Sequence, residues 1–175
     1  MGLGRLEDNA TLHSLRAIDQ GQYSVLAGVG GENHLFIIQL FPWTIPSFNG
    51  ILVHAAAQAA RQASIPVAVH LDHSQDEDMV KQTCLLPFDS IMIDMSHQFK
   101  EENLAKTKEL VAYFLARGKA TEAELGRIEG GEDGILDTLN LAGFMTTAEE
   151  AQQFVDAGVD LLAPTFGNVH GDYGP

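Results

Sequence analysis

The stretch PVAVHLDH at residues 66–73 decides the fold, because it joins a mostly apolar run of strand length to a polar end. Runs that are apolar on both faces are typical of parallel strands covered by helices on the outside. Comparable runs recur along the chain: YSVLAGV at 23–29, LFIIQLF at 35–41, FDSIMI at 88–93, ATEAEL at 120–125 and VDLLAPTF at 159–166. Together these runs predict a sheet of about six strands.

Helical patterns lie between these runs. Residues 50–63 are rich in alanine, and residues 101–117 place their large apolar side chains along one stripe before Gly118. Two pairs with capping-box spacing predict further helix starts, Ser74 with Glu77 and Thr147 with Glu150. The alternation of strand and helix predicts an α/β fold with a parallel sheet, and the length of residues 1–175 fits a single domain.

Composition narrows the classes of function. The chain has 175 residues, of which 45% are hydrophobic, and a net charge of −14 that argues against nucleic-acid binding. No basic run offers a membrane patch, and no apolar run reaches the ~20 residues of a transmembrane helix. Cys84 is the single cysteine, and the first residues contain no apolar core of a signal peptide. We therefore expect a cytoplasmic protein.

Polar residues that could carry chemistry follow four successive predicted strands. Asp72 and His73 end the first of these strands, and the next three end at Asp94, at Glu124 and near His170. In βα-barrels the catalytic residues lie at the carboxyl ends of the strands, so these side chains are expected at one rim. Two imidazoles with carboxylates suit zinc or a similar divalent ion. Most catalytic zinc sites use three protein ligands, so this set looks one nitrogen ligand short.

For one loop and two histidines, the sequence allows two interpretations each. The acidic loop EGGEDG at 129–134 is either a solvated turn or a flap that brings Glu132 to the metal rim. His70 either lines the interior of the barrel or has a structural role. His97 either supports Asp94 or begins the next helix.

Five segments, in this order along the chain, resemble the class II, zinc-dependent fructose-bisphosphate aldolases, and their sequences are most similar to those of fungal members. They are VHLDHSQDED at 69–78, FDSIMIDMSH at 88–97, KEENLAKTKELVAYFLARG at 100–118, TEAELGRIEGGEDG at 121–134 and GVDLLAPTFGNVHGDYGP at 158–175. The resemblance covers nearly everything from residue 35 to residue 175. It implies an incomplete TIM (β/α)8-type barrel of about six parallel strands.

The resemblance also implies roles for individual residues. His73 and His170 would be zinc ligands, and Asp94 and Glu124 match positions of a second or alternate metal site. Asp72 would exchange a proton with the hydroxyl formed or cleaved in the aldol step, and Glu132 would handle the proton beside the ketone. One position, Gly171, matches a backbone site near the substrate phosphate.

The implied reaction is the zinc-dependent, reversible cleavage of fructose 1,6-bisphosphate into dihydroxyacetone phosphate and glyceraldehyde 3-phosphate. Zinc would stabilise the negative charge on the ketone oxygen as a Lewis acid. A lysine Schiff base is the other way to stabilise that charge, but no lysine lies at a predicted strand end. The expected partner is a phosphorylated sugar. The sequence does not distinguish fructose bisphosphate from tagatose bisphosphate as the substrate. The resemblance is also compatible with a homodimer.

The chain departs from the family pattern in two places. It stops at Pro175, before the next two βα units and the third zinc histidine that the family carries. Only residues 30–34 separate the first two predicted strands, whereas a parallel crossover needs about a dozen residues, so a helix is missing there. We therefore expect this chain alone to be poorly stable and inactive or nearly so. The alternative to an enzyme is a metal-binding aldolase fragment or paralogue without catalysis; a metallohydrolase on a similar barrel is much less favoured.

Overall fold

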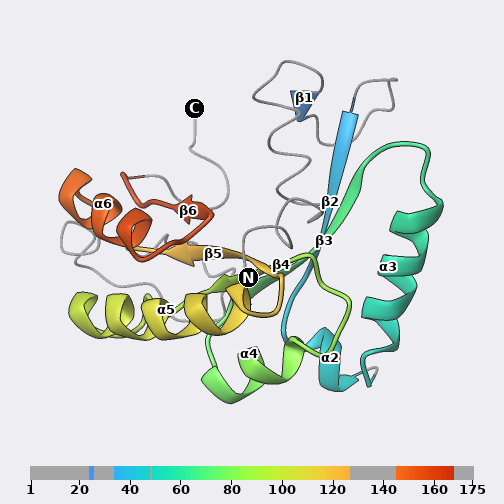
Figure 1. Ribbon diagram of the computed structural model, residues 1–175, viewed down its shortest axis with the longest axis horizontal. Coiled ribbons are helices and arrows are strands. Elements are labelled where there is room, and N and C mark those ends of the chain that lie inside the picture. Colours follow the sequence, from blue (N-terminus) through green and yellow to red (C-terminus); the bar gives the residue numbers. More distant parts are fainter. Residues whose placement is uncertain (1–23, 26–33, 48, 127–144, 168–175) are drawn as a thin grey trace, which may run out of the picture.

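The computed structural model describes residues 24–25, 34–47, 49–126 and 145–167 (Figure 1). It contains one sheet in which six parallel strands follow one another in sequence order. The strands are β1 (Ser24–Val25), β2 (His34–Leu40), β3 (Val67–Ser74), β4 (Ser90–Ile93), β5 (Ala120–Glu124) and β6 (Leu161–Ala163). The parallel sheet predicted from the apolar runs is therefore confirmed.

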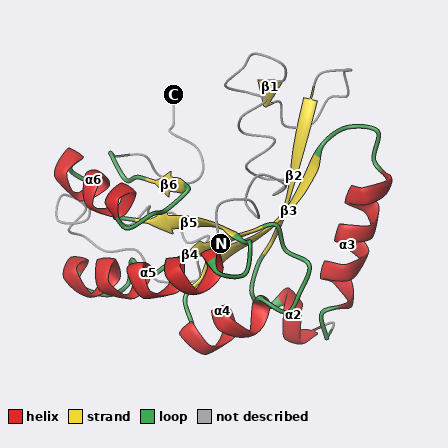
Figure 2. Cartoon of the chain, in the orientation of Figure 1, coloured by secondary structure: helices red, strands yellow, loops and turns green. Residues whose placement is uncertain are grey.

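Helices alternate with the strands and cover the outer side of the curved sheet (Figures 1 and 2). They are α2 (Thr44–Ser47), α3 (Ile51–Gln62), α4 (Glu77–Thr83), α5 (Lys100–Leu115) and α6 (Ala148–Asp156). Sequential parallel strands with helices on one side form an arc of a (β/α)8 barrel. None of the helices in the described part of the chain combines the length and apolar composition that a bilayer crossing demands. The predicted loss of a helix after residue 29 falls outside the described residues, and the single domain stays a prediction.

The hydrophobic core lies between the sheet and its outer helices. Val69 and Leu71 of β3 and Ile91 and Ile93 of β4 are fully buried in it. Val53 of α3, Val80 of α4 and Leu110, Val111 and Phe114 of α5 pack against them. Because side chains alternate along a strand, the residues between these apolar ones face the other side of the sheet. That alternation places His70 and Asp72 on the inner side, toward the barrel axis.

One of the two capping boxes is present. Thr147 Oγ1 accepts from the Glu150 backbone N–H, and Glu150 Oε2 accepts from the Thr147 N–H, as predicted. The prediction for Ser74 was wrong, because Ser74 is the last residue of β3 and is fully buried. Asp76 caps α4 instead, and its carboxylate accepts from the Met79 N–H at 2.7 Å. The strand runs three residues beyond its apolar run, which ends at Leu71, and therefore includes Ser74.

The Phe114→Ala variant tests the core directly. Phe114 is 0% exposed and packs in the cluster between α5 and the sheet, so truncation leaves a cavity. We expect the free energy of unfolding to fall by about 3–5 kcal/mol, measured by urea denaturation. The neighbouring Leu115, 42% exposed on the same helix, is the control, and its alanine variant should lose far less. Equal losses in the two variants would contradict this placement of the core.

Candidate metal and active site

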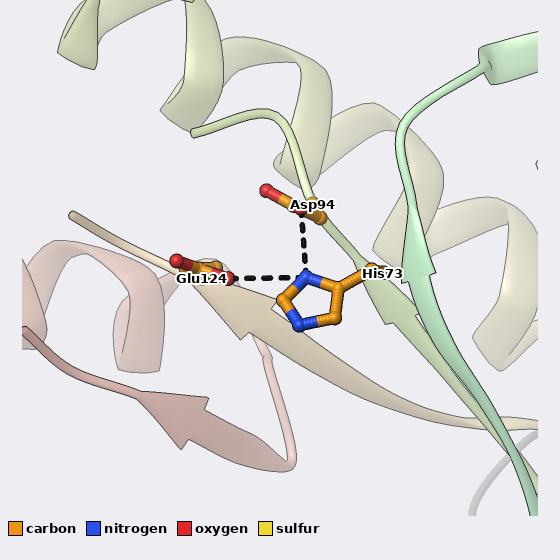
Figure 3. Close-up of side chains that lie close together, drawn as sticks. All are labelled: His73, Asp94 and Glu124. Carbon is orange, nitrogen blue, oxygen red and sulfur yellow. Dashed lines mark hydrogen bonds and ion pairs between the residues drawn. The ribbon is translucent and has the colours of Figure 1, made fainter. Parts of the chain in front are cut away.

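The carboxyl ends of three neighbouring strands bring an imidazole and two carboxylates together (Figure 3). His73 lies near the end of β3, Asp94 directly follows β4, and Glu124 is the last residue of β5. Parallel strands end at the same edge of their sheet, which is why residues 51 positions apart meet there. His73 Nδ1 lies 3.0 Å from Asp94 Oδ2 and 3.5 Å from Glu124 Oε2.

This group has the composition of a divalent metal site. Its three potential ligand atoms all lie within 4.8 Å of one another, and both carboxylate residues are buried. Two buried carboxylates repel each other unless a cation compensates them, and an imidazole with carboxylates suits zinc and similar ions. The residues therefore fit the metal that the sequence predicts, with His73, Asp94 and Glu124 as the described candidates for ligands.

The His73 ring can hold an ion in two ways. Its Nδ1 faces both carboxylates, while Nε2 points away from them (Figure 3). An ion at Nδ1 would sit with the two carboxylates and replace the hydrogen bond to Asp94. An ion at Nε2 would leave that hydrogen bond in place, and Asp94 would then orient the ring from behind.

The backbone of His73 is itself unusual. Its φ is 45°, in the left-handed region that residues other than glycine seldom adopt. The pairing of β3 with β4 also shifts register between Leu71 and Ser74, so the strand bulges at this point. Bulges re-aim side chains, and strained residues of this kind cluster at functional sites. The bulge turns His73 toward Asp94 instead of letting it follow the strict alternation of the strand.

Asp94 is fixed by neighbours that the sequence did not point to. Its Oδ1 accepts from the Ser96 hydroxyl at 2.6 Å and from the Ser96 N–H at 3.1 Å. Its Oδ2 accepts from Gln75 Nε2 at 2.9 Å, in addition to its contact with His73. These hydrogen bonds stabilise the ionised carboxylate in a buried position. Exposed His97, three residues after Asp94, lies in the turn before α5.

The charges of the site shift its own pKa values. Burial alone would lower the pKa of His73, but the hydrogen bond to Asp94 and the charges of Asp72, Asp94 and Glu124 raise it to about 9. Burial would raise the pKa of Asp94, but hydrogen bonds from His73, Ser96 and Gln75 lower it to about 2. Without metal, the site therefore holds an imidazolium beside an ionised carboxylate at neutral pH.

Zinc binding should consequently depend on pH. Zinc coordinates neutral imidazole, so it must displace the proton that His73 keeps up to a pKa of about 9. We expect the affinity to rise ~tenfold per pH unit between pH 6 and pH 8, because one proton competes with the ion. Competition with a chelating dye at pH 6, 7 and 8 measures this slope. In His73→Ala the slope should nearly vanish, and a wild-type affinity independent of pH would contradict the proton competition.

Asp72 lies beside this cluster on β3. Its Oδ2 accepts from Gln39 Nε2 at 3.3 Å, which ties it to the neighbouring strand β2. Its negative charge helps to raise the pKa of His73 and also that of Glu122. The structure thus places the predicted acid/base next to the predicted metal ligands, within reach of their charges.

A buried polar layer lies below the cluster on the inner side of the sheet. His70 Nδ1 is 2.8 Å from Ser90 Oγ, and His70 Nε2 is 3.4 Å from Glu122 Oε2. Burial and the charge on His73 lower the pKa of His70 to about 4, and burial with Asp72 raises that of Glu122 to about 7. His70 is buried among these partners, which fits both of its interpretations. Glu122 was missed, although its spacing of two from Glu124 places both on one face of β5.

The remaining predicted site residues, Glu132, His170 and Gly171, lie outside the described residues.

Comparison with known proteins decides the family. A family model described as "Fructose-bisphosphate aldolase class-II" matches residues 21–175. The chain belongs to this family. Class II aldolases are generally metal-dependent lyases that act on phosphorylated sugars, in keeping with the His/Asp/Glu cluster on this aldolase chain.

Two relatives show how far the likeness extends. A Coccidioides immitis protein named "Putative fructose-bisphosphate aldolase" is 56% identical over 164 residues, which are 89% of this chain and 54% of that protein. The fructose-bisphosphate aldolase of Streptococcus pyogenes is 45% identical over 111 residues, 63% of this chain and 36% of that enzyme. This aldolase-family chain therefore spans about half, or less, of the length of these relatives.

Solved structures agree with the fold. A Coccidioides immitis crystal structure, of a protein described in the same terms, matches with a TM-score of 0.82 and 45% identity, covering 97% of this chain and 64% of that one. The YdjI aldolase of Escherichia coli K12 matches with a TM-score of 0.63 and 25% identity, covering 93% of this chain and 54% of that one. The arc of parallel strands is thus the class II aldolase barrel in part.

Proposed function

We propose that this chain carries the catalytic site of a zinc-dependent fructose-bisphosphate aldolase, for the reversible cleavage of fructose 1,6-bisphosphate into dihydroxyacetone phosphate and glyceraldehyde 3-phosphate, and that cleavage by this chain on its own is slow. The observation that carries the proposal is the cluster of His73, Asp94 and Glu124 at the carboxyl rim of a class II aldolase sheet. Family membership alone would give the fold. The donor set of the cluster supports the metal-dependent chemistry.

The metal would be held by His73 with Asp94 and Glu124, and by His170 as the resemblance implies. When bound, zinc supplies Lewis-acid stabilisation of the negative charge that develops on the ketone oxygen during cleavage. The protein must keep its own charges compatible with that ion. Asp94 does so by remaining ionised while buried, because Ser96 and Gln75 donate hydrogen bonds to it.

Asp72 would carry the first proton transfer. In the cleavage direction its carboxylate takes the proton of the substrate hydroxyl, and the adjacent carbon–carbon bond breaks as that oxygen becomes the aldehyde. The electron pair of the broken bond stays on the carbon beside the ketone, and Glu132 would deliver a proton to that carbon. Two separate carboxyl groups thus balance the two proton transfers, with Asp72 held in place by Gln39.

The remaining elements of the proposal are the partners and the location. The substrate is a phosphorylated ketose, and Gly171 would lie near one of its phosphates. Homodimer formation and a cytoplasmic location stay predictions from the resemblance and the single cysteine.

The proposal is tested by measuring dihydroxyacetone phosphate formation from fructose 1,6-bisphosphate with a coupled dehydrogenase. Cleavage should appear with added zinc, disappear with a chelator and return when zinc is restored. Tagatose 1,6-bisphosphate, tested in parallel, distinguishes the two ketoses. No cleavage in any of these conditions would rule out the aldolase activity of this chain.

A second candidate is a metal-binding aldolase fragment or paralogue without turnover, because the cluster of His73, Asp94 and Glu124 could hold an ion without catalysing cleavage. Zinc titration separates the two candidates, because the fragment would bind zinc with no cleavage at any zinc concentration.

A further inference from the structure

Three parallel rings stand at the rim beside the metal cluster. Phe41 directly follows β2, which pairs in parallel with β3, so its position is next to that of His73 at the same edge. The rings of Phe41 and His73 have centroids 5.9 Å apart and planes that differ by 8°. The rings of Phe41 and Trp43 are closer, at 4.3 Å and 10°. Phe41 thus stacks on a candidate metal ligand and on a tryptophan at once.

The segment that carries these rings is held in a defined turn. Thr44 N–H and the Thr44 hydroxyl both donate to the Phe41 carbonyl, at 3.0 and 2.6 Å, and Ile45 N–H donates to the Pro42 carbonyl at 3.1 Å. Trp43 nevertheless remains 56% exposed, although tryptophan is a residue that folding normally buries to a large extent. A fixed backbone that presents an exposed aromatic side chain lowers the ordering cost of binding a ligand there.

The contact of Phe41 with His73 constrains the imidazole plane. Asp94 fixes the ring at Nδ1, but a single hydrogen bond leaves the ring able to tilt. The parallel Phe41 ring limits that tilt from one side. Hydrogen-bonding groups that orient a metal ligand typically change metal affinity 10–100-fold when removed, and we expect a stacked ring that limits the same motion to act at the lower end of that range.

The exposed face of Trp43 points to a class of ligand. The face of an aromatic ring carries partial negative charge, so it attracts the partly positive C–H groups of a carbon chain. Pockets for small molecules are lined mainly by such apolar and aromatic surfaces, with a few polar groups that fix orientation. Here the polar groups are those of the neighbouring cluster with Asp72.

We propose that Phe41 and Trp43 form an aromatic wall of the substrate site, in which Phe41 positions the His73 imidazole and Trp43 binds the C–H surface of a sugar carbon chain. The proposal rests on the aldolase function proposed above, because it places the sugar next to the zinc ligands. Phe41 is a positioning residue that acts through His73, whereas Trp43 contacts the substrate.

The role of Phe41 is tested by zinc affinity, which needs no turnover. Phe41→Ala should weaken zinc binding by about tenfold, and Phe41→Tyr, which keeps the stacked ring, should restore it. Leu85→Ala is the matched control, because Leu85 is 89% exposed in the turn after α4, outside the aromatic wall. Urea denaturation confirms that each variant is folded. Unchanged zinc affinity in folded Phe41→Ala would overturn the positioning role.

The role of Trp43 is tested by its own fluorescence, since it is the only tryptophan in the chain. Fructose 1,6-bisphosphate added to the zinc-loaded chain should change Trp43 emission and protect it from acrylamide quenching. Inorganic phosphate, which lacks a C–H surface, should do neither. Emission that does not respond to saturating sugar bisphosphate would overturn the contact.

Kinetics separate this inference from the function on which it rests. If the wild type cleaves the sugar, Trp43→Ala should raise KM several-fold with kcat nearly unchanged, and Trp43→Tyr should recover most of the loss. An unchanged KM in Trp43→Ala would overturn the wall while leaving the aldolase function in place. If the wild type does not cleave the sugar, the proposed aldolase function is wrong. The zinc-affinity and fluorescence measurements still test the roles of Phe41 and Trp43.

Discussion

Replacing His73 with alanine is expected to weaken zinc binding by ~100-fold or more and to reduce aldol cleavage to background. His73 is the imidazole that faces both Asp94 and Glu124, so its loss leaves two buried carboxylates without the group that joins them. Zinc affinity by competition with a chelating dye and cleavage by the coupled assay measure the two effects.

His97→Ala is the matched control for this variant. His97 is also a histidine near the carboxyl rim, but it is exposed in the turn before α5 and lies outside the cluster. Its variant should bind zinc as the wild type does. Equal losses of zinc affinity in His73→Ala and His97→Ala would show that the ion does not bind at the cluster.

Replacing Asp72 with asparagine is expected to lower kcat by about 10²–10⁴-fold, because the amide cannot accept the hydroxyl proton. Zinc affinity should change much less, since Asp72 lies outside the cluster of His73, Asp94 and Glu124. The variant keeps the size of the side chain, so the contact with Gln39 can re-form and the fold should be retained. Single-turnover cleavage with a parallel zinc titration separates the chemical step from metal binding.

Asp78→Asn provides the comparison for Asp72→Asn. Asp78 is an exposed carboxylate in the first turn of α4, and its loss should leave kcat unchanged. A kcat for Asp72→Asn close to the wild-type value would remove Asp72 from the proton transfer.

The sheet could be predicted because its signal is local. Each strand of a parallel sheet with helices packed on it is largely apolar on both faces, as LFIIQLF and PVAVHL are. Polar residues at the turns then mark where each strand ends. The rim positions of Asp72, His73, Asp94 and Glu124 followed from the same pattern, since parallel strands end together. The resemblance then supplied the roles of these residues, which the pattern alone does not give.

The support that Asp94 receives from Gln75 could not be predicted, because it depends on a contact between distant segments. Gln75 follows β3 and reaches Asp94 across the gap to the next strand, beyond the register shift between Leu71 and Ser74, and no local pattern reports that shift. Ser74 was mistaken for a helix cap for the same reason. Phe41 could have been found, because the rule that examines strand ends applies equally to the end of β2.

Zinc K-edge X-ray absorption of the zinc-loaded chain tests the proposed site most directly. The cluster predicts nitrogen and oxygen ligands at roughly 2.0–2.2 Å with imidazole scattering, and a changed spectrum in His73→Ala. Cys84 should not contribute, because burial raises the pKa of its thiol to about 11. A sulfur shell at about 2.3 Å, or a spectrum unaffected by the loss of His73, would contradict zinc binding at His73, Asp94 and Glu124.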